Sequence, residues 1–183
     1  MLDAILAAND PHLAPFVGLP GKDNGFDLEG LAVRGTRVWI GLRGPVLREW
    51  CCILELHLEA DGDRLRLQSA NGALYRKHFV KLRGLGVRDL LAVGDDLLIL
   101  AGPTMAHDGP TGIWRWRNGA KEGASADPGD ITQVLALPQV ESADRAEGMA
   151  LLDDASLLVV FDAPSDARKI DARTVLADVF RLP

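Results

Sequence analysis

The chain has 183 residues, 48% of them hydrophobic and 25% charged, which is typical of a globular protein with one core. Its formal net charge of −6 argues against nucleic acid and against a membrane surface as partners, because both attract basic proteins. The sequence has no apolar run near the roughly 20 residues that span a bilayer, and its start lacks the basic residues of a secretory signal. It therefore predicts a cytoplasmic protein.

The first element expected in chain order is a short helix within residues 1–20. Leu2, Ile5 and Leu6 share one helical face, and an Asn-Asp-Pro run after them ends the helix. This segment is predicted to be a helical connector that precedes a domain over residues 21–183.

The two cysteines, Cys51 and Cys52, are neighbours on a predicted strand. Adjacent strand residues point to opposite faces, so a disulfide between them would be strained. We expect two buried, reduced thiols. No cysteine or histidine spacing in the sequence indicates a zinc site.

Three stretches of the chain, residues 27–45, 87–103 and 145–164, resemble one another. Each has an acidic residue near its start, two short apolar runs around a Gly or Asp turn, and a proline at its end. Two apolar runs joined by such a tight turn predict a β-hairpin. The chain therefore contains an internal repeat, and the repeat is built from strands.

Aligned on the acidic residues Glu29, Asp89 and Glu147, the copies follow one another after 60 and 58 residues. Further alternating runs lie between them, so each period holds about four strands and no long helix. A repeated four-stranded antiparallel sheet is the signature of a β-propeller blade. A β-sandwich, the main alternative, rarely has internal repeats at this spacing. The predicted fold is all-β and β-propeller-like, with about three four-stranded antiparallel blades over residues 21–80, 81–139 and 140–183.

Three blades are fewer than the four to eight that usually close a propeller, so this is a half or open propeller. Its first and last blades would leave sheet faces and edges exposed, and exposed edges invite pairing with another chain. We expect either a homodimer that completes the ring or a missing N-terminal half that does so.

The blocks GFDLEGLAVRGTRVWIGLRGPVLREW, GLGVRDLLAVGDDLLILAGPT, IWRWR and AEGMALL resemble one bacterial family, the domain-of-unknown-function 3616 family. The resemblance runs over nearly the whole chain and corresponds to the C-terminal half of a usual member. It implies a β-propeller fold and no established activity. More distantly, the EGLA and EGMA strands resemble inner strands of gluconolactonase-like and phytase-like propellers, which place carboxylates on a channel metal, usually calcium.

If each copy begins the innermost strand of a blade, Glu29, Asp89 and Glu147 lie near one rim of the channel. Three converging carboxylates suit a hard cation such as Ca²⁺, and Asn24 or Asp27 could supplement them. In the alternative interpretation, these side chains cap backbone N–H groups of a neighbouring blade or pair with arginine. Arginines that lie nearby in sequence are Arg34, Arg43, Arg88 and Arg145.

Two Gly/Pro-rich loops follow the second strands of the first two copies and fall on the rim, where loops commonly bind ligands. Their polar groups are Arg43, Thr104, His107 and Asp108, and we take these as candidate ligand-binding residues. His107 beside Asp108 could form a base with an orienting acid, although sequence neighbours seldom have that geometry. Arg43 could bind an anion or pair with an inner-strand carboxylate, and we favour the pairing.

Trp114 and Trp116 alternate with Arg115 and Arg117 in the run WRWRNG. Such a pattern can form a nucleic-acid platform. In a strand that precedes a turn, it more simply predicts an outer strand whose tryptophans pack between blades.

The sequence has no GxSxG, HExxH or GxxxxGK[ST] motif. The first function hypothesis is an uncharacterised β-propeller scaffold that binds a ligand or partner at the channel rim. The alternative is a Ca²⁺-dependent hydrolase or lactonase with a carboxylate-lined channel site. The third hypothesis is that the chain is a remnant fragment without an independent function.

Overall fold

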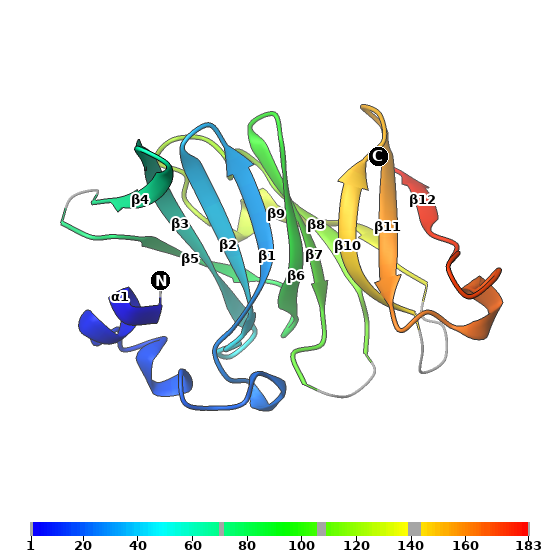
Figure 1. Cartoon of the computed structure of the whole chain (residues 1–183), viewed down its shortest axis with the longest axis horizontal. Helices are drawn as coiled ribbons and strands as arrows, with labels where there is room; N and C mark the ends of the chain where they lie inside the picture. The colour runs from blue at the N-terminus through cyan, green and yellow to red at the C-terminus, as the bar shows by residue number, and fades with distance from the viewer. Residues whose placement is uncertain (1, 70–71, 106–108, 139–143, 183) are drawn as a thin grey trace.

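The computed structural model describes residues 2–69, 72–105, 109–138 and 144–182, and these form three antiparallel sheets that follow one another along the chain (Figure 1). A short helix, α1 (Leu2–Ala7), and two 3₁₀ turns precede the first sheet. The predicted all-β class with three antiparallel sheets is confirmed. No helix within the described ranges is long and apolar enough to span a membrane.

The first sheet contains five strands in the part of the chain that is described. They are β1 (Asp27–Arg34), β2 (Arg37–Gly44), β3 (Trp50–Asp61), β4 (Arg64–Gln68) and β5 (Arg76–Lys81). Strand β3 is 12 residues long, so two shorter strands share its outer edge. One half of that edge pairs with β4 and the other half with β5. The fourth strand position expected from the sequence is therefore divided between two strands.

Among the described residues, the second sheet has the four strands in sequential order that the repeat predicts. They are β6 (Gly86–Val93), β7 (Asp96–Gly102), β8 (Gly112–Trp116) and β9 (Ile131–Ala136). The third sheet has three strands among the described residues. They are β10 (Arg145–Leu151), β11 (Ser156–Asp162) and β12 (Asp178–Arg181). The segment between β11 and β12 carries a 3₁₀ turn and an isolated bridge from Lys169 to Val175, so this sheet lacks the fourth strand expected of each repeat among the described residues.

Two hydrophobic layers hold the three sheets against one another. The layer between the first and second sheets includes Trp39, Ile53, Ile99 and Trp116, none of which is exposed. The layer between the second and third sheets includes Leu98 and similar buried residues. The middle sheet is thus covered on both faces, which explains why β7 is continuously apolar instead of alternating. The expected packing of Trp114 and Trp116 between sheets is confirmed.

Glycines allow the first and second sheets to approach closely. A Cβ atom on Gly41 of β2 would overlap the side chain of Val87 in β6, and a Cβ atom on Gly30 would lie 2.8 Å from the same valine. The glycine of the repeated EG pair in the first copy therefore serves sheet packing.

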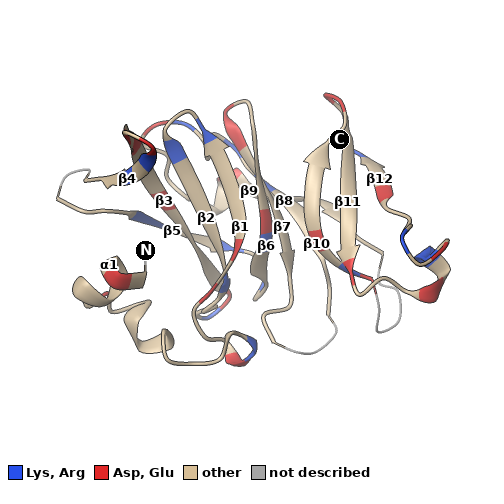
Figure 2. Cartoon of the chain, in the orientation of Figure 1, with Lys and Arg blue, Asp and Glu red and all other residues tan. Residues whose placement is uncertain are grey.

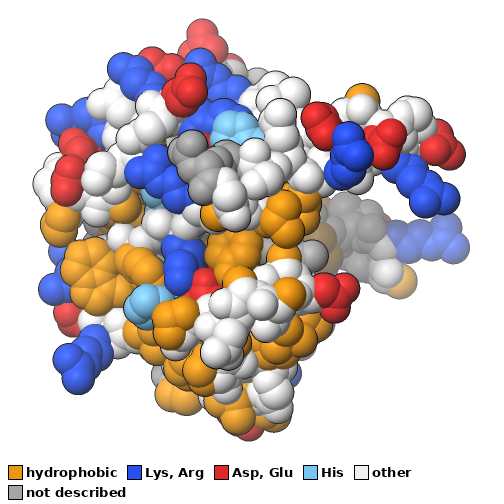
Figure 3. All heavy atoms as spheres, turned by 90° about the vertical axis from the view of Figure 1, so that its left-hand side faces the viewer, with side chains coloured by type: hydrophobic (Ala, Val, Ile, Leu, Met, Phe, Trp, Pro, Cys, Tyr) orange, Lys and Arg blue, Asp and Glu red, His pale blue; other side chains and the backbone are white. Residues whose placement is uncertain are grey.

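The N-terminal segment packs on the outer face of the first sheet. Ile5 is fully buried there, whereas Leu2 and Leu6 of the same helix are 43% and 48% exposed. The shared helical face predicted from the sequence thus buries one residue, because α1 is only six residues long. Asp10 fixes the segment through Tyr75 Oη, 2.7 Å from its Oδ2, and Lys77 Nζ, 2.8 Å from its Oδ1. Figure 3 shows hydrophobic side chains gathered on the lower part of this face, where α1 and the following turns lie.

Cys51 and Cys52 are both buried and form no disulfide within the described structure, as expected from their adjacency. Burial raises the pKa of both thiols, that of Cys52 to about 12. They are packed as small apolar residues on opposite faces of β3.

Candidate functional site

The first strand of each sheet has a β-bulge near its start, and the bulges define the candidate site. The residues that the pairing register skips are Glu29 in β1, Arg88 in β6 and Glu147 in β10. Arg88 is 59 residues from each of the other two. A bulge turns its extra side chain away from the regular pleat, so these three side chains occupy equivalent places. The structural equivalent of Glu29 and Glu147 is therefore Arg88, one residue before Asp89. Figure 2 shows acidic positions in red on β6 and β10.

The Arg88 guanidinium lies between the two glutamates. Its Nη1 is 3.1 Å from Glu29 Oε2 and 2.8 Å from Glu147 Oε1, and its Nη2 donates to the carbonyl of Pro103. Arg88 is 8% exposed. A buried guanidinium requires acceptors for its donors, and here the acceptors come from all three sheets or their loops.

Arg43, at the end of β2, extends this network. Its Nη1 donates to Glu29 Oε1 at 2.9 Å and its Nε donates to the carbonyl of Thr104 at 3.0 Å. Asp27 Oδ2 lies 3.6 Å from the same Nη1. The Glu29 carboxylate therefore bridges two arginines, and the arginine pairing favoured for Arg43 is formed.

Asp89 has a different role from the two glutamates. Its Oδ1 accepts the N–H of Leu90 at 2.8 Å, and its Oδ2 accepts the N–H of Met149 in β10 at 2.8 Å. Burial raises the pKa of Asp89, and the backbone N–H donors, including one from Leu31 in β1, oppose that rise. Asp89 thus caps backbone groups of both neighbouring sheets, which is the alternative that the sequence left open for these acids.

The Glu147 carboxyl group has a raised pKa. Burial raises its pKa, the Arg88 guanidinium opposes the rise, and the nearby Glu29 adds to it. The side chains of Glu29 and Glu147 are 22% and 27% exposed, so both carboxylates still reach solvent.

Asn24 uses both atoms of its side-chain amide on the loop after β2. Its Oδ1 accepts the N–H of Val46 at 2.8 Å, and its Nδ2 donates to the carbonyl of the same residue at 3.2 Å. Thr104 is 8% exposed and takes part through its backbone carbonyl. His107 and Asp108, the other two candidate ligand-binding residues, lie outside the described residues.

The structure thus brings together Glu29, Glu147, Arg43 and the Thr104 carbonyl, and it places the carboxylate of Asp89 between the sheets. Across the described ranges, no group of three His, Cys, Asp or Glu side chains is arranged to hold a metal ion. Ca²⁺ binding by Glu29, Asp89, Glu147 and Asn24 stays a prediction.

The comparisons with known proteins give one match. The family described as "Protein of unknown function (DUF3616)" matches residues 2–178. The chain belongs to this family. No curated protein and no solved structure matched the chain. Membership of DUF3616 confirms the resemblance read from the EGLAVRG and GLRGPV blocks.

From the sequence, Arg88 is expected only as one of four arginines that could pair with the acidic residues, and this pairing is formed at the centre of the site. Alignment on acidic residues pairs Asp89 with Glu29, whereas alignment on the following apolar residues pairs RDLL with EGLA and EGMA. The second alignment matches the strand register. Alignment of the repeats on their apolar residues therefore identifies structurally equivalent positions better than alignment on their acidic residues.

Proposed function

We propose that this DUF3616 chain is a scaffold of the β-propeller type that binds a positively charged group of a ligand or partner at the channel rim. The binding groups are the carboxylates of Asp27, Glu29 and Glu147. The observation that carries the proposal is the pair of glutamates on one buried guanidinium nitrogen, Arg88 Nη1, with both carboxylates still partly open to solvent.

The charges of the rim favour a cation. Its two arginines are buried and contact carboxylates and backbone carbonyls, so the partly exposed groups are the carboxylates. Proximity of Glu29 raises the pKa of Glu147, in addition to the effect of burial. A cation that approached both glutamates would relieve this repulsion. The arginines also hold the carboxylates in fixed positions, which lowers the entropy lost on binding.

Agmatine, which carries a guanidinium and an ammonium group, is a suitable probe for calorimetric titration. We expect weak, saturable binding that falls about tenfold in Glu147→Gln, because a charge-assisted hydrogen bond is lost. Asp154→Asn is the matched control, since it removes one exposed acid from the turn at the other end of the same sheet. Equal binding by Glu147→Gln and the wild type would refute the proposal.

The Ca²⁺-dependent hydrolase or lactonase stays the second candidate, and the same two glutamates support it, because oxygen ligands suit calcium. Titration with calcium chloride, followed by the melting temperature, separates the two functions. A rise in melting temperature that Glu29→Gln abolishes would favour a metal site. Agmatine binding without any effect of calcium would favour the scaffold.

A further inference from the structure

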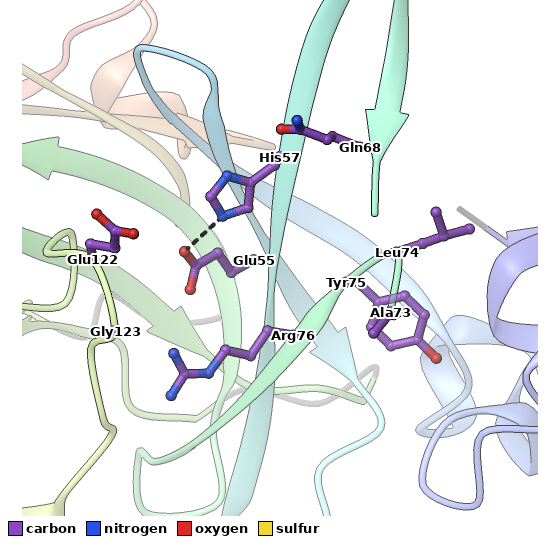
Figure 4. A pocket seen from close by; sticks show the side chains of 9 residues that line it. All are labelled: Glu55, His57, Gln68, Ala73, Leu74, Tyr75, Arg76, Glu122 and Gly123. Atoms are coloured by element: carbon purple, nitrogen blue, oxygen red, sulfur yellow. Dashed lines mark ion pairs between the residues drawn. The ribbon is translucent and has the colours of Figure 1, made fainter. Parts of the chain in front are cut away.

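A pocket of about 440 Å³ lies at the junction of the first and second sheets, away from the rim site (Figure 4). The first sheet contributes residues of β3 and β4, the first residue of β5 and the segment leading into it, and the loop after β8 contributes Glu122 and Gly123. Pockets for small ligands commonly have volumes of about 300–1,000 Å³, so the space suits a small organic molecule.

The strand register places a row of polar residues beside this pocket. Arg37 pairs with His57, and Glu55 lies opposite Arg76 on the next strand. Directly paired residues of antiparallel strands share one face. In Figure 4 the side chains of Glu55, His57 and Arg76 point to the same side of the sheet, toward the loop that carries Glu122.

A buried network of charged residues, formed by Glu55, Arg37 and His78, forms part of the pocket wall. Glu55 is 5% exposed and accepts from Arg37 Nε at 2.8 Å and Nη2 at 2.6 Å, while His78 Nε2 lies 2.8 Å from its other oxygen. Arg37 also donates to the carbonyls of Ala120 and Lys121, which fixes the loop before Glu122. A buried network of charges seldom makes a protein more stable than apolar residues in the same place would. Its position at the wall of a pocket therefore points to a functional role.

His57 and Arg76 are the donors that the pocket presents. His57 Nε2 is 3.6 Å from Glu55 Oε1, which orients the ring, and its side chain is 32% exposed. The guanidinium of Arg76 forms no hydrogen bond or ion pair with the residues that the structure describes, and the residue is exposed. Ala73 and Leu74 add apolar surface.

We infer that this pocket binds a small organic monocarboxylate. Arg76 binds the carboxylate through its forked donors, His57 donates a further hydrogen bond, and the apolar body of the ligand contacts Ala73. The carboxylates of Glu55 and Glu122 in the same walls disfavour a dianion such as sulfate. The site is separate from the rim and does not rest on the function proposed there.

Benzoate is the probe, with benzamide as its uncharged counterpart, and binding is followed by NMR chemical-shift changes of the intact chain. We expect saturable binding of benzoate at millimolar concentration, about tenfold weaker in Arg76→Gln. The matched control is Arg64→Gln, an exposed arginine of β4 that does not line the pocket. His57→Gln is the second variant, and it is expected to weaken benzoate binding as well.

Three results would overturn the inference. They are equal binding of benzamide and benzoate, equal loss of binding in Arg64→Gln and Arg76→Gln, and no shift changes at about 20 mM benzoate, well above the millimolar range expected of a fragment-sized ligand. Displacement of benzoate by sulfate at equal concentration would also contradict it, because the pocket would then accept a dianion.

Discussion

Among single residues, Glu55 carries a buried negative charge that is held by Arg37 and His78. Burial opposes its ionisation, but the hydrogen bonds from His78 and Arg37 outweigh burial and lower the pKa of Glu55 from 4.5 to about 2. A carboxyl whose pKa is lowered on folding stabilises the fold above its unfolded pKa. This contribution is lost as the pH falls from 4.5 toward 2.

Glu55→Gln is therefore expected to lower the free energy of unfolding at pH 7 by about 3 kcal/mol, the equivalent of the pKa shift. Urea unfolding at pH 7 and at pH 3 measures the effect, and the variant should lose less stability than the wild type between these values. Glu59→Gln, on the same strand but 39% exposed and paired with exposed Arg66, should change stability by less than about 0.5 kcal/mol. Equal effects of the two substitutions would contradict this account.

At the scale of elements, the close packing of β2 against β6 depends on Gly41. A Cβ atom there would overlap Val87, so Gly41→Ala must move the two sheets apart. We expect a loss of about 2 kcal/mol in the free energy of unfolding, as for other overpacked cores. Gly129→Ala, where the added Cβ would meet open space, is the control.

The double variant Gly41→Ala with Val87→Ala tests the cause, because it removes the atoms that overlap. Its effect should be smaller than the sum of the two single effects, since the residues are in contact. Strict additivity in urea unfolding would mean that Gly41→Ala acts through something other than this contact.

The strands and the bulges differ in how far the sequence predicts them. The hairpins β1–β2, β6–β7 and β10–β11 are predicted because a tight Gly or Asp turn between apolar runs is a local signal. A bulge adds one residue to a strand and leaves no local signal, so the shift that places Arg88 beside Glu29 is missed. Likewise, Glu55 and Arg76 become neighbours only because β3 pairs with β5. Their spacing in the sequence does not predict this pairing.

At the scale of the whole molecule, the outer faces of the first and third sheets carry exposed apolar residues in the described structure, although the N-terminal segment covers part of the first. Leu31 and Val33 of β1 are each 57% exposed, and Val160 and Val179 of the third sheet are 46% and 56% exposed. These faces are where a further sheet would pack if the predicted homodimer or an additional half completed a ring. The homodimer stays a prediction that light scattering after size-exclusion chromatography can test.

The alternation of Glu29, Arg88 and Glu147 has a consequence for that ring. The three bulge residues alternate in charge along the three sheets, and the series begins and ends with a glutamate. The first and the third sheet therefore each carry a glutamate at the bulge. A second copy joined with the same step between sheets would set Glu147 beside the Glu29 of the copy, with no arginine at a bulge position between them. Self-association should therefore strengthen as the pH falls below neutrality, because burial and the nearby Glu29 raise the pKa of Glu147 and its protonation relieves the repulsion. An additional sheet with a basic residue at its own bulge would pair with Glu147 or Glu29 and could pack there at neutral pH without this repulsion.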